Sequence, residues 1–335
     1  MIVGYVEPSG EAPELARAEV AGAAGAVGGA WAGPEAVAMP GLIAVAVPSE
    51  RSLGELAARL ALARRTLVLL APRSGTPEAA RAEGRLGRPA AFRRLGEPGA
   101  VADAAVKEAG RAYVAGGGSI DLDAPEARYW IVRRADGAES LLREVAAVDR
   151  GQVALRAMPR LPFRRPVSLP PRLARAAVNL AGVRPGDRVL DPFLGTGALL
   201  AEAALLGARL YGVDADATMV QGALRNFAHL GVRAEALVEG DARAVELPGT
   251  GGPFDAIVTD PPYGRSSASV GAAPSSLVPE VLGRWAERLR EGGPVVVLSP
   301  GGPALLAAPW TEELRVAVRV HRSLTREFRR YRRPR

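Results

Sequence analysis

Residues Asp260-Pro261-Pro262-Tyr263 carry the groups that chemistry on the amino group of a nucleobase needs. They close an apolar run over residues 254–259 that is typical of a buried strand, and two prolines force the chain to leave the sheet as a stiff loop. The lone pair of such an amino group is delocalised into the ring, so acceptors for its N–H bonds are needed to direct it. The Asp260 carboxylate and the Pro261 carbonyl are such acceptors, and Tyr263 could stack on the base for about 1–3 kcal/mol. We therefore predict that these four residues are catalytic and serve methyl transfer to nitrogen.

Aspartates at the ends of further strands predict the cofactor site. The turn 191–197 reads Asp-Pro-Phe-Leu-Gly-Thr-Gly, in which glycine lets the backbone approach a ligand and the following helix presents free amides. Asp214 lies 19 residues after Gly195, at the end of the next strand, where an acid meets ribose hydroxyls. Asp241 ends the third strand and could accept from an adenine amino group. The residues that we expect to bind the cofactor are Asp191, Phe193, Gly195, Thr196, Gly197, Asp214, Asp241 and Asp260.

Two other nucleotide-binding patterns are absent from this turn. A phosphate-binding loop needs Gly-Lys followed by Ser or Thr, and the dinucleotide pattern needs a third glycine where Leu200 stands. No phosphate therefore has to be cradled, which favours S-adenosylmethionine as the cofactor. A paired base cannot reach such a site, so it would have to be flipped out or lie in loosened RNA.

Alternating strand and helix patterns after residue 172 would position these residues. Apolar strands that alternate with helices of about 10–14 residues predict a parallel sheet covered on both faces, which is an α/β fold. A last strand with a period of two residues runs over 313–321. The acids would then meet at one edge of the sheet, outside the carboxyl ends of its strands.

The first half of the chain predicts a different architecture. Residues 1–150 read as an α+β region of two small lobes, with an extended segment over 111–114 and a loop over 73–89. Four prolines near the end of 151–171 favour an extended linker there. We therefore expect an N-terminal region, this linker and a second domain over 172–335.

The basic residues are concentrated in two segments of a chain whose net charge is +7. Residues 151–172 hold five arginines and no acid, and residues 315–335 hold nine arginines and only Glu327. Such segments could grip a polyanion, or they could be solvated surface. Arg265, after the proline loop, could contact a backbone phosphate or lie in a mobile loop. The arginines that we expect to bind RNA are Arg164, Arg165, Arg265, Arg326, Arg329 and Arg330.

Composition excludes several classes of site. The chain has no cysteine and only two histidines, so disulfides, thiolate sites and histidine-rich metal sites are excluded, and we expect no metal. No apolar run reaches the ~18 residues of a membrane span. Acidic residues precede any basic stretch at the N-terminus, so a secretory signal is not expected. We expect a cytoplasmic protein.

Several segments resemble the archaeal-type THUMP-containing tRNA (guanine(10)-N2)-methyltransferase family. The segments that resemble its catalytic domain are Pro166–Arg175, Asp191–Phe193 and Asp260–Ser267, and His321–Arg326 is similar to its C-terminal strand. Weaker similarity to its ferredoxin-like and THUMP regions lies in Glu14–Val20 and Ile120–Pro125.

The resemblance implies a Rossmann-like class I methyltransferase domain with a seven-stranded, mostly parallel sheet, preceded by a ferredoxin-like and THUMP region that grips tRNA. It implies methylation of guanosine N2 at position 10, once or twice, with S-adenosylmethionine, as part of tRNA processing. We expect a monomer. Two alternatives remain open: an adenine-N6 DNA methyltransferase, which shares the proline loop, and an RNA-binding protein with an inactive methyltransferase fold. The choice of guanine over adenine rests on the resemblance alone.

Overall fold

The computed structural model describes residues 1–33, 36–70, 75–96, 99–157, 160–165, 168–248, 251–262, 274–303, 305–307, 309–321 and 324–333. The chain divides into two compact units. The first unit comprises Met1–Gly10, Val27–Ala58 and Ala63–Val148, and the second comprises Glu11–Ala26, Arg59–Leu62 and Asp149–Arg335. The division is therefore not a single cut at residue 150, because two segments from the first half of the chain belong to the second unit.

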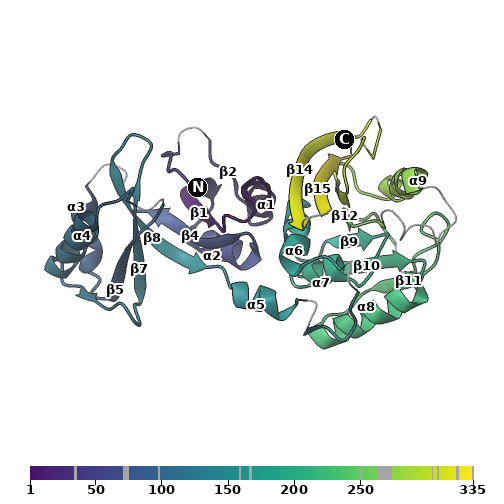
Figure 1. Cartoon of the computed structure of the whole chain (residues 1–335), viewed down its shortest axis with the longest axis horizontal. Helices are drawn as coiled ribbons and strands as arrows, with labels where there is room; N and C mark the ends of the chain where they lie inside the picture. The colour runs from purple at the N-terminus through teal and green to yellow at the C-terminus, as the bar shows by residue number, and fades with distance from the viewer. Residues whose placement is uncertain are drawn as a thin grey trace. The chain divides into compact units, whose positions relative to one another are not determined.

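A seven-stranded sheet forms the centre of the second unit (Figure 1). Its parallel strands stand in the order β11-β10-β9-β12-β13, and β15 lies antiparallel between β13 and β14. The α/β fold with a seven-stranded, mostly parallel sheet is thus confirmed. The strands are β9 (Arg188–Asp191), β10 (Arg209–Asp214), β11 (Ala236–Glu239), β12 (Ala256–Thr259), β13 (Pro294–Ser299), β14 (Thr311–His321) and β15 (Leu324–Arg332).

Helices cover both faces of this sheet, because its central strands carry apolar side chains on both sides. Val296 and Leu298 of β13 share a core with α6, α7 and α8, whereas Val295 and Val297 share the opposite core with α9. The helices of the second unit are α1 (Pro13–Ala26), α5 (Arg150–Leu155), α6 (Pro171–Leu180), α7 (Ala198–Ala204), α8 (Ala217–Leu230) and α9 (Pro274–Glu287).

Strand β15 contains C-terminal arginines that the sequence alone places either in a polyanion-binding segment or on solvated surface. Its residues Phe328 and Tyr331 are fully buried and belong to the two opposite cores, so they fix the strand from both faces of the sheet. The arginines between them are therefore part of a central strand. The sequence predicts β14 but not β15, because arginine is so frequent in 324–332 that the apolar alternation of a strand is hidden.

Helix α1 joins the second unit through a buried carboxylate. Glu19 is fully buried, and its oxygens accept hydrogen bonds from the backbone N–H groups of Ala61 and Leu62 at 2.8 and 2.9 Å. The side chain of Asn179 on α6 donates to the same carboxylate at 2.9 Å. Because a buried carboxylate is costly unless it is hydrogen-bonded, these contacts explain why residues from the first half of the chain pack with α6.

An eight-stranded sheet in the order β2-β3-β1-β4-β8-β7-β5-β6 forms the first unit. Along the chain, the order β1-α1-β2-β3-α2-β4 is a ferredoxin-like succession, although its helix α1 belongs to the second unit. The elements are β1 (Ile2–Pro8), β2 (Ala30–Trp31), β3 (Ile43–Val47), α2 (Glu50–Arg59), β4 (Ala63–Leu69), α3 (Thr76–Gly84), β5 (Pro89–Arg94), α4 (Asp103–Ala115), β6 (Ser119–Ile120), β7 (Ala127–Arg133) and β8 (Glu139–Ala147).

Two local expectations in the first unit are wrong. Residues 111–114 belong to helix α4, whose buried Ala109 and Tyr113 lie one turn apart, and residues 76–84 form helix α3 rather than a loop. A Cβ atom on Gly84 would lie 2.1 Å from the carbonyl oxygen of Tyr113, so glycine is what allows α3 and α4 to pack this closely. Among the described residues, no helix has the length and apolar character needed to cross a membrane.

Candidate functional site

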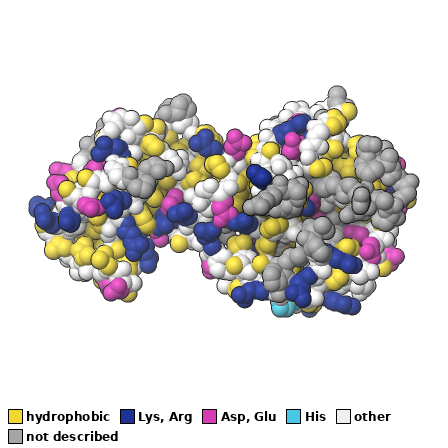
Figure 2. Space-filling view, in the orientation of Figure 1, with side chains coloured by type: hydrophobic (Ala, Val, Ile, Leu, Met, Phe, Trp, Pro, Cys, Tyr) yellow, Lys and Arg dark blue, Asp and Glu magenta, His cyan; other side chains and the backbone are white. Residues whose placement is uncertain are grey.

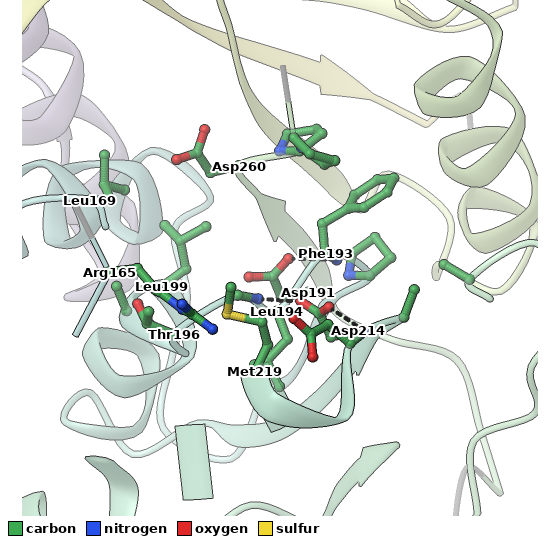
Figure 3. A pocket seen from close by; sticks show the side chains of 18 of the residues that line it. Arg165, Leu169, Asp191, Phe193, Leu194, Thr196, Leu199, Asp214, Met219 and Asp260 are labelled. Carbon is green, nitrogen blue, oxygen red and sulfur yellow. Dashed lines mark hydrogen bonds between the residues drawn. The ribbon is translucent and has the colours of Figure 1, made fainter. Parts of the chain in front are cut away.

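A cavity of about 690 Å³ opens at the carboxyl ends of the parallel strands of the second unit (Figure 3). Ligands of open parallel sheets bind at this edge, and the volume is typical of small-molecule sites. Its lining includes these residues predicted from the sequence: Asp191, Phe193, Gly195, Thr196, Asp214, Asp241, Asp260, Pro261 and Pro262. Gly197 belongs to the same turn, whereas Tyr263 lies outside the described residues. Four strand ends thus bring their acids to one cavity.

The glycine turn after β9 is fastened by Asp214 of β10. The Asp214 carboxylate accepts hydrogen bonds from the backbone N–H groups of Gly195 at 2.7 Å and Asp216 at 2.9 Å. Gly195 and Gly197 have φ angles of 52° and 79°, a backbone region that favours glycine. A Cβ atom on Gly197 would lie 2.7 Å from the ring of Phe227. The turn is therefore held close to the end of β10, where a ribose would lie.

Asp191 lies beneath the cavity and is almost completely buried. Its carboxylate accepts hydrogen bonds from the Thr259 hydroxyl at 2.6 Å and from the Phe193 N–H at 3.0 Å. Burial raises the pKa of Asp191 to about 7, and the nearby charges of Asp260 and Asp214 act in the same direction. A cation in the cavity would therefore favour the ionised form of Asp191. Sequence reasoning missed Thr259, because a threonine inside an apolar strand gives no signal of its own.

The Asp241 carboxylate accepts hydrogen bonds from a neighbouring side chain. The Arg243 guanidinium donates from Nε to both oxygens of Asp241 at 3.0 Å, and these hydrogen bonds lower the pKa of the carboxyl. Asp241 therefore lines the cavity as a carboxylate whose oxygens are already in use. An adenine amino group would have to share this carboxylate with Arg243 or displace it.

Asp260 faces an arginine from the far end of the chain. Nη2 of Arg326 on β15 lies 3.1 Å from an oxygen of Asp260, and both side chains are largely buried. Leu324 of the same strand also lines the cavity. The carboxylate at the start of the proline loop is thus held against a fixed cation at the cavity wall, and it could accept hydrogen bonds from an amino group there. The pair is 66 positions apart in the sequence, so no local pattern predicts it.

Comparisons with known proteins agree with this geometry. The family described as "RMKL-like, methyltransferase domain" matches residues 160–327, half of the chain. The chain belongs to this family. Its methyltransferase domain therefore has the Rossmann-like class I fold that the seven-stranded sheet displays.

Relatives and solved structures add detail. The chain is 39% identical over 192 residues to the tRNA (guanine(10)-N2)-dimethyltransferase of Methanothermobacter thermautotrophicus, covering 56% of each protein. It is 48% identical over 108 residues to the enzyme of the same name from Pyrococcus abyssi, covering 32% of each. The chain thus spans about half of the length of these relatives or less. The crystal structure of TrmN from Thermus thermophilus aligns over 99% of both chains with 23% identity and a TM-score of 0.47.

The segment expected to be an extended linker is fixed to the methyltransferase domain. Helix α5 begins it, and Arg156 forms a two-contact ion pair with the buried Glu202 at 2.7 and 3.1 Å. Further along, Arg164 is exposed, whereas its neighbour Arg165 lines the cavity. Two adjacent arginines with the same expected role therefore have different surroundings. Arg265 lies outside the described residues.

The C-terminal arginines differ from the RNA-binding role expected for them. Arg329 is fully buried, donates to Glu327 at 2.9 Å and to the carbonyl of Gly302 at 2.7 Å, and also reaches the carbonyl of Pro303. Arg330 is partly buried and pairs with Glu313 at 2.8 Å. Arg329 thus joins β15 to the loop after β13, and Arg330 joins β15 to β14. Arg329 has no exposed surface that RNA could contact.

Proposed function

We propose that this chain transfers the methyl group of S-adenosylmethionine to the N2 amino group of a guanosine in tRNA, at position 10. The observation that carries the proposal is the Asp260 carboxylate, which is held by Arg326 at the wall of a cavity lined by three further strand-end acids. The names of the relatives, tRNA (guanine(10)-N2)-dimethyltransferases, supply the base and the substrate class.

The lining residues fit S-adenosylmethionine. Asp214 at the end of β10 can accept from ribose hydroxyls, and Asp241 stands where an adenine would lie. The buried Asp191 and its neighbours make the cavity acidic, which suits a positively charged sulfonium. When bound, the cofactor would supply an electrophilic methyl group.

The proline loop would orient the acceptor base. Asp260 and the Pro261 carbonyl would accept the two N–H bonds of the amino group, so that its lone pair points at the methyl carbon. Arg326 would keep the Asp260 carboxylate in place, and Tyr263 would stack on the base. When the methyl group is transferred from the bound cofactor, the amino group would lose one proton, which the Asp260 carboxylate would accept.

We also propose that the first unit and Arg164 contribute to holding the RNA. Exposed arginines of the first unit are Arg51, Arg64, Arg81, Arg85, Arg93, Arg94, Arg111, Arg128 and Arg133. Figure 2 shows Lys and Arg side chains interspersed with acids over the visible face. Electrostatic attraction to phosphate would therefore come from dispersed arginines.

The decisive experiment supplies labelled S-adenosylmethionine with unmodified tRNA or with duplex DNA and then identifies the labelled nucleoside. We expect label in N2-methylguanosine or N2-dimethylguanosine, and only with tRNA. Label in N6-methyladenine would replace the proposal with the adenine-N6 DNA methyltransferase alternative. Absence of transfer to either, with tRNA still bound, would favour an inactive methyltransferase fold.

A further inference from the structure

More acids than arginines line the cavity. Five lining residues are acids, namely Asp191, Asp214, Asp216, Asp241 and Asp260, and two are arginines, namely Arg165 and Arg326. The proposed cofactor carries a sulfonium and an ammonium group, which the acids can attract, and also one carboxylate. That carboxylate needs a hydrogen-bond donor, and a guanidinium is the side chain that best matches its planar geometry.

The two lining arginines are not equally available. Arg326 is already paired with Asp260 at 3.1 Å. For Arg165, no ion pair is found within the described part of the chain, and its Nε is buried without a hydrogen-bond partner there. A buried donor that lacks a partner is unfavourable, so a ligand that supplies an acceptor gains affinity at this point.

The side chain of Arg165 points into the cavity. It reaches in beside Thr196 and Met219, on the side away from Phe193 in the view of Figure 3. The preceding Arg164 is exposed instead, as expected for successive residues of an extended segment. Of the two adjacent arginines, one therefore faces the cofactor cavity and the other faces solvent.

The backbone that carries Arg165 is fastened to the floor of the cavity. Asn226 of α8 accepts a hydrogen bond from the N–H of Phe163 at 3.0 Å and donates to its carbonyl at 3.1 Å. The same amide donates to the carbonyl of Thr196 in the glycine turn at 3.0 Å. A Cβ atom on Gly222 would lie only 2.1 Å from the Phe163 ring, so glycine allows this ring to pack against α8. Asn226 thus ties Arg165 to the turn that would bind the cofactor.

We propose that Arg165 binds the carboxylate of the amino-acid part of the cofactor. This assignment rests on the proposed use of S-adenosylmethionine and replaces the RNA-binding role expected from the sequence. The backbone two residues before Arg165 is held by Asn226 before the ligand arrives, so little backbone freedom is lost there on binding. A further consequence is that the segment before α6 belongs to the cofactor site.

The test compares ligands with and without the carboxylate. Calorimetry would measure binding of S-adenosylmethionine and of decarboxylated S-adenosylmethionine to the full chain and to Arg165→Ala, with Arg164→Ala as the matched control. We expect Arg165→Ala to weaken S-adenosylmethionine binding about 10- to 100-fold and to leave binding of the decarboxylated ligand within about twofold. Arg164→Ala should bind both ligands like the unaltered chain, and Arg165→Lys should recover part of the loss.

Each other outcome has a defined meaning. Equal loss of affinity for both ligands in Arg165→Ala would overturn the inference, since it would show that Arg165 shapes the cavity rather than binding the carboxylate. Unchanged binding of S-adenosylmethionine would overturn it too. If the same variant then bound tRNA more weakly, the RNA-binding role expected from the sequence would hold for Arg165. Failure of the unaltered chain to bind S-adenosylmethionine would instead contradict the proposed function.

Discussion

The two arginine-rich segments, 151–172 and 315–335, look alike in the sequence and differ in the structure. The first follows the surface of the methyltransferase domain and leaves Arg164 exposed. The second contains a central strand, in which Arg329 is buried and its hydrogen bonds are made within the protein. Each segment also sends one arginine, Arg165 or Arg326, into the cavity. Charge density along a sequence therefore does not tell which arginines face a polyanion.

The largest contrast between the segments should appear in stability. Arg329→Ala should lower the free energy of unfolding by about 3–5 kcal/mol, because the largely buried Glu327 would lose its ion-pair partner and the carbonyl of Gly302 would lose its donor. Arg164→Ala, the control, should change it by less than about 0.5 kcal/mol. Urea unfolding followed by circular dichroism measures both. Equal values would erase the distinction between a structural and a solvated arginine.

The next contrast concerns the two cavity arginines. Arg326→Ala should lower kcat about 100-fold while leaving S-adenosylmethionine affinity within about tenfold, because a displaced Asp260 would misplace the amino group. Arg165→Ala should show the opposite division, with cofactor affinity as the main loss. Asp260→Ala should abolish turnover and still bind cofactor within about tenfold. If Arg326→Ala lost tight binding of S-adenosylmethionine and kept its kcat, the roles assigned to the two arginines would be reversed.

The charge of an acid in the cavity should make cofactor binding depend on pH. Burial raises the pKa of Asp191 to about 7, so Asp191 is protonated below that pH and charged above it. A sulfonium is attracted only by the charged form, so S-adenosylmethionine affinity should rise as pH increases through 7, by at most tenfold per pH unit.

The control for this prediction is a ligand without the positive sulfur. S-adenosylhomocysteine should show a smaller rise between pH 5.5 and 8.5, and Asp191→Asn should flatten the profile for S-adenosylmethionine. Calorimetry at each pH gives the dissociation constants. Parallel profiles for the two ligands would assign the pH dependence to another group.

The smallest effect is expected at the exposed arginine. Arg164→Ala should weaken tRNA binding a few-fold and reduce the slope of log affinity against log salt by about one, because one phosphate contact would be lost. Arg165→Ala should leave that slope unchanged. Filter binding over a range of salt concentrations measures both slopes. An unchanged slope in Arg164→Ala would leave this residue as solvated surface without an RNA contact.

The sequence predicts much of the cofactor cavity, because its residues lie at regular positions. Asp191, Asp214, Asp241 and Asp260 each follow a short apolar run, and parallel strands end at one edge of a sheet. The glycines at 195 and 197 were recognisable because few residues adopt their φ angles. Strand β15 and helix α3 could not be recognised, since arginine and alanine hide the apolar period in both.

By itself, the sequence determined the α/β order of the second unit, the chemistry of the proline loop and the acids at the strand ends. These are local properties, set by the types of neighbouring residues. Only the tertiary structure decided the surroundings of the arginines: Arg326 meets Asp260 across 66 positions, and Asn226 joins Phe163, two residues before Arg165, to the glycine turn. Such contacts depend on which segments become neighbours in the packed sheet, and the types of neighbouring residues along the chain do not set this.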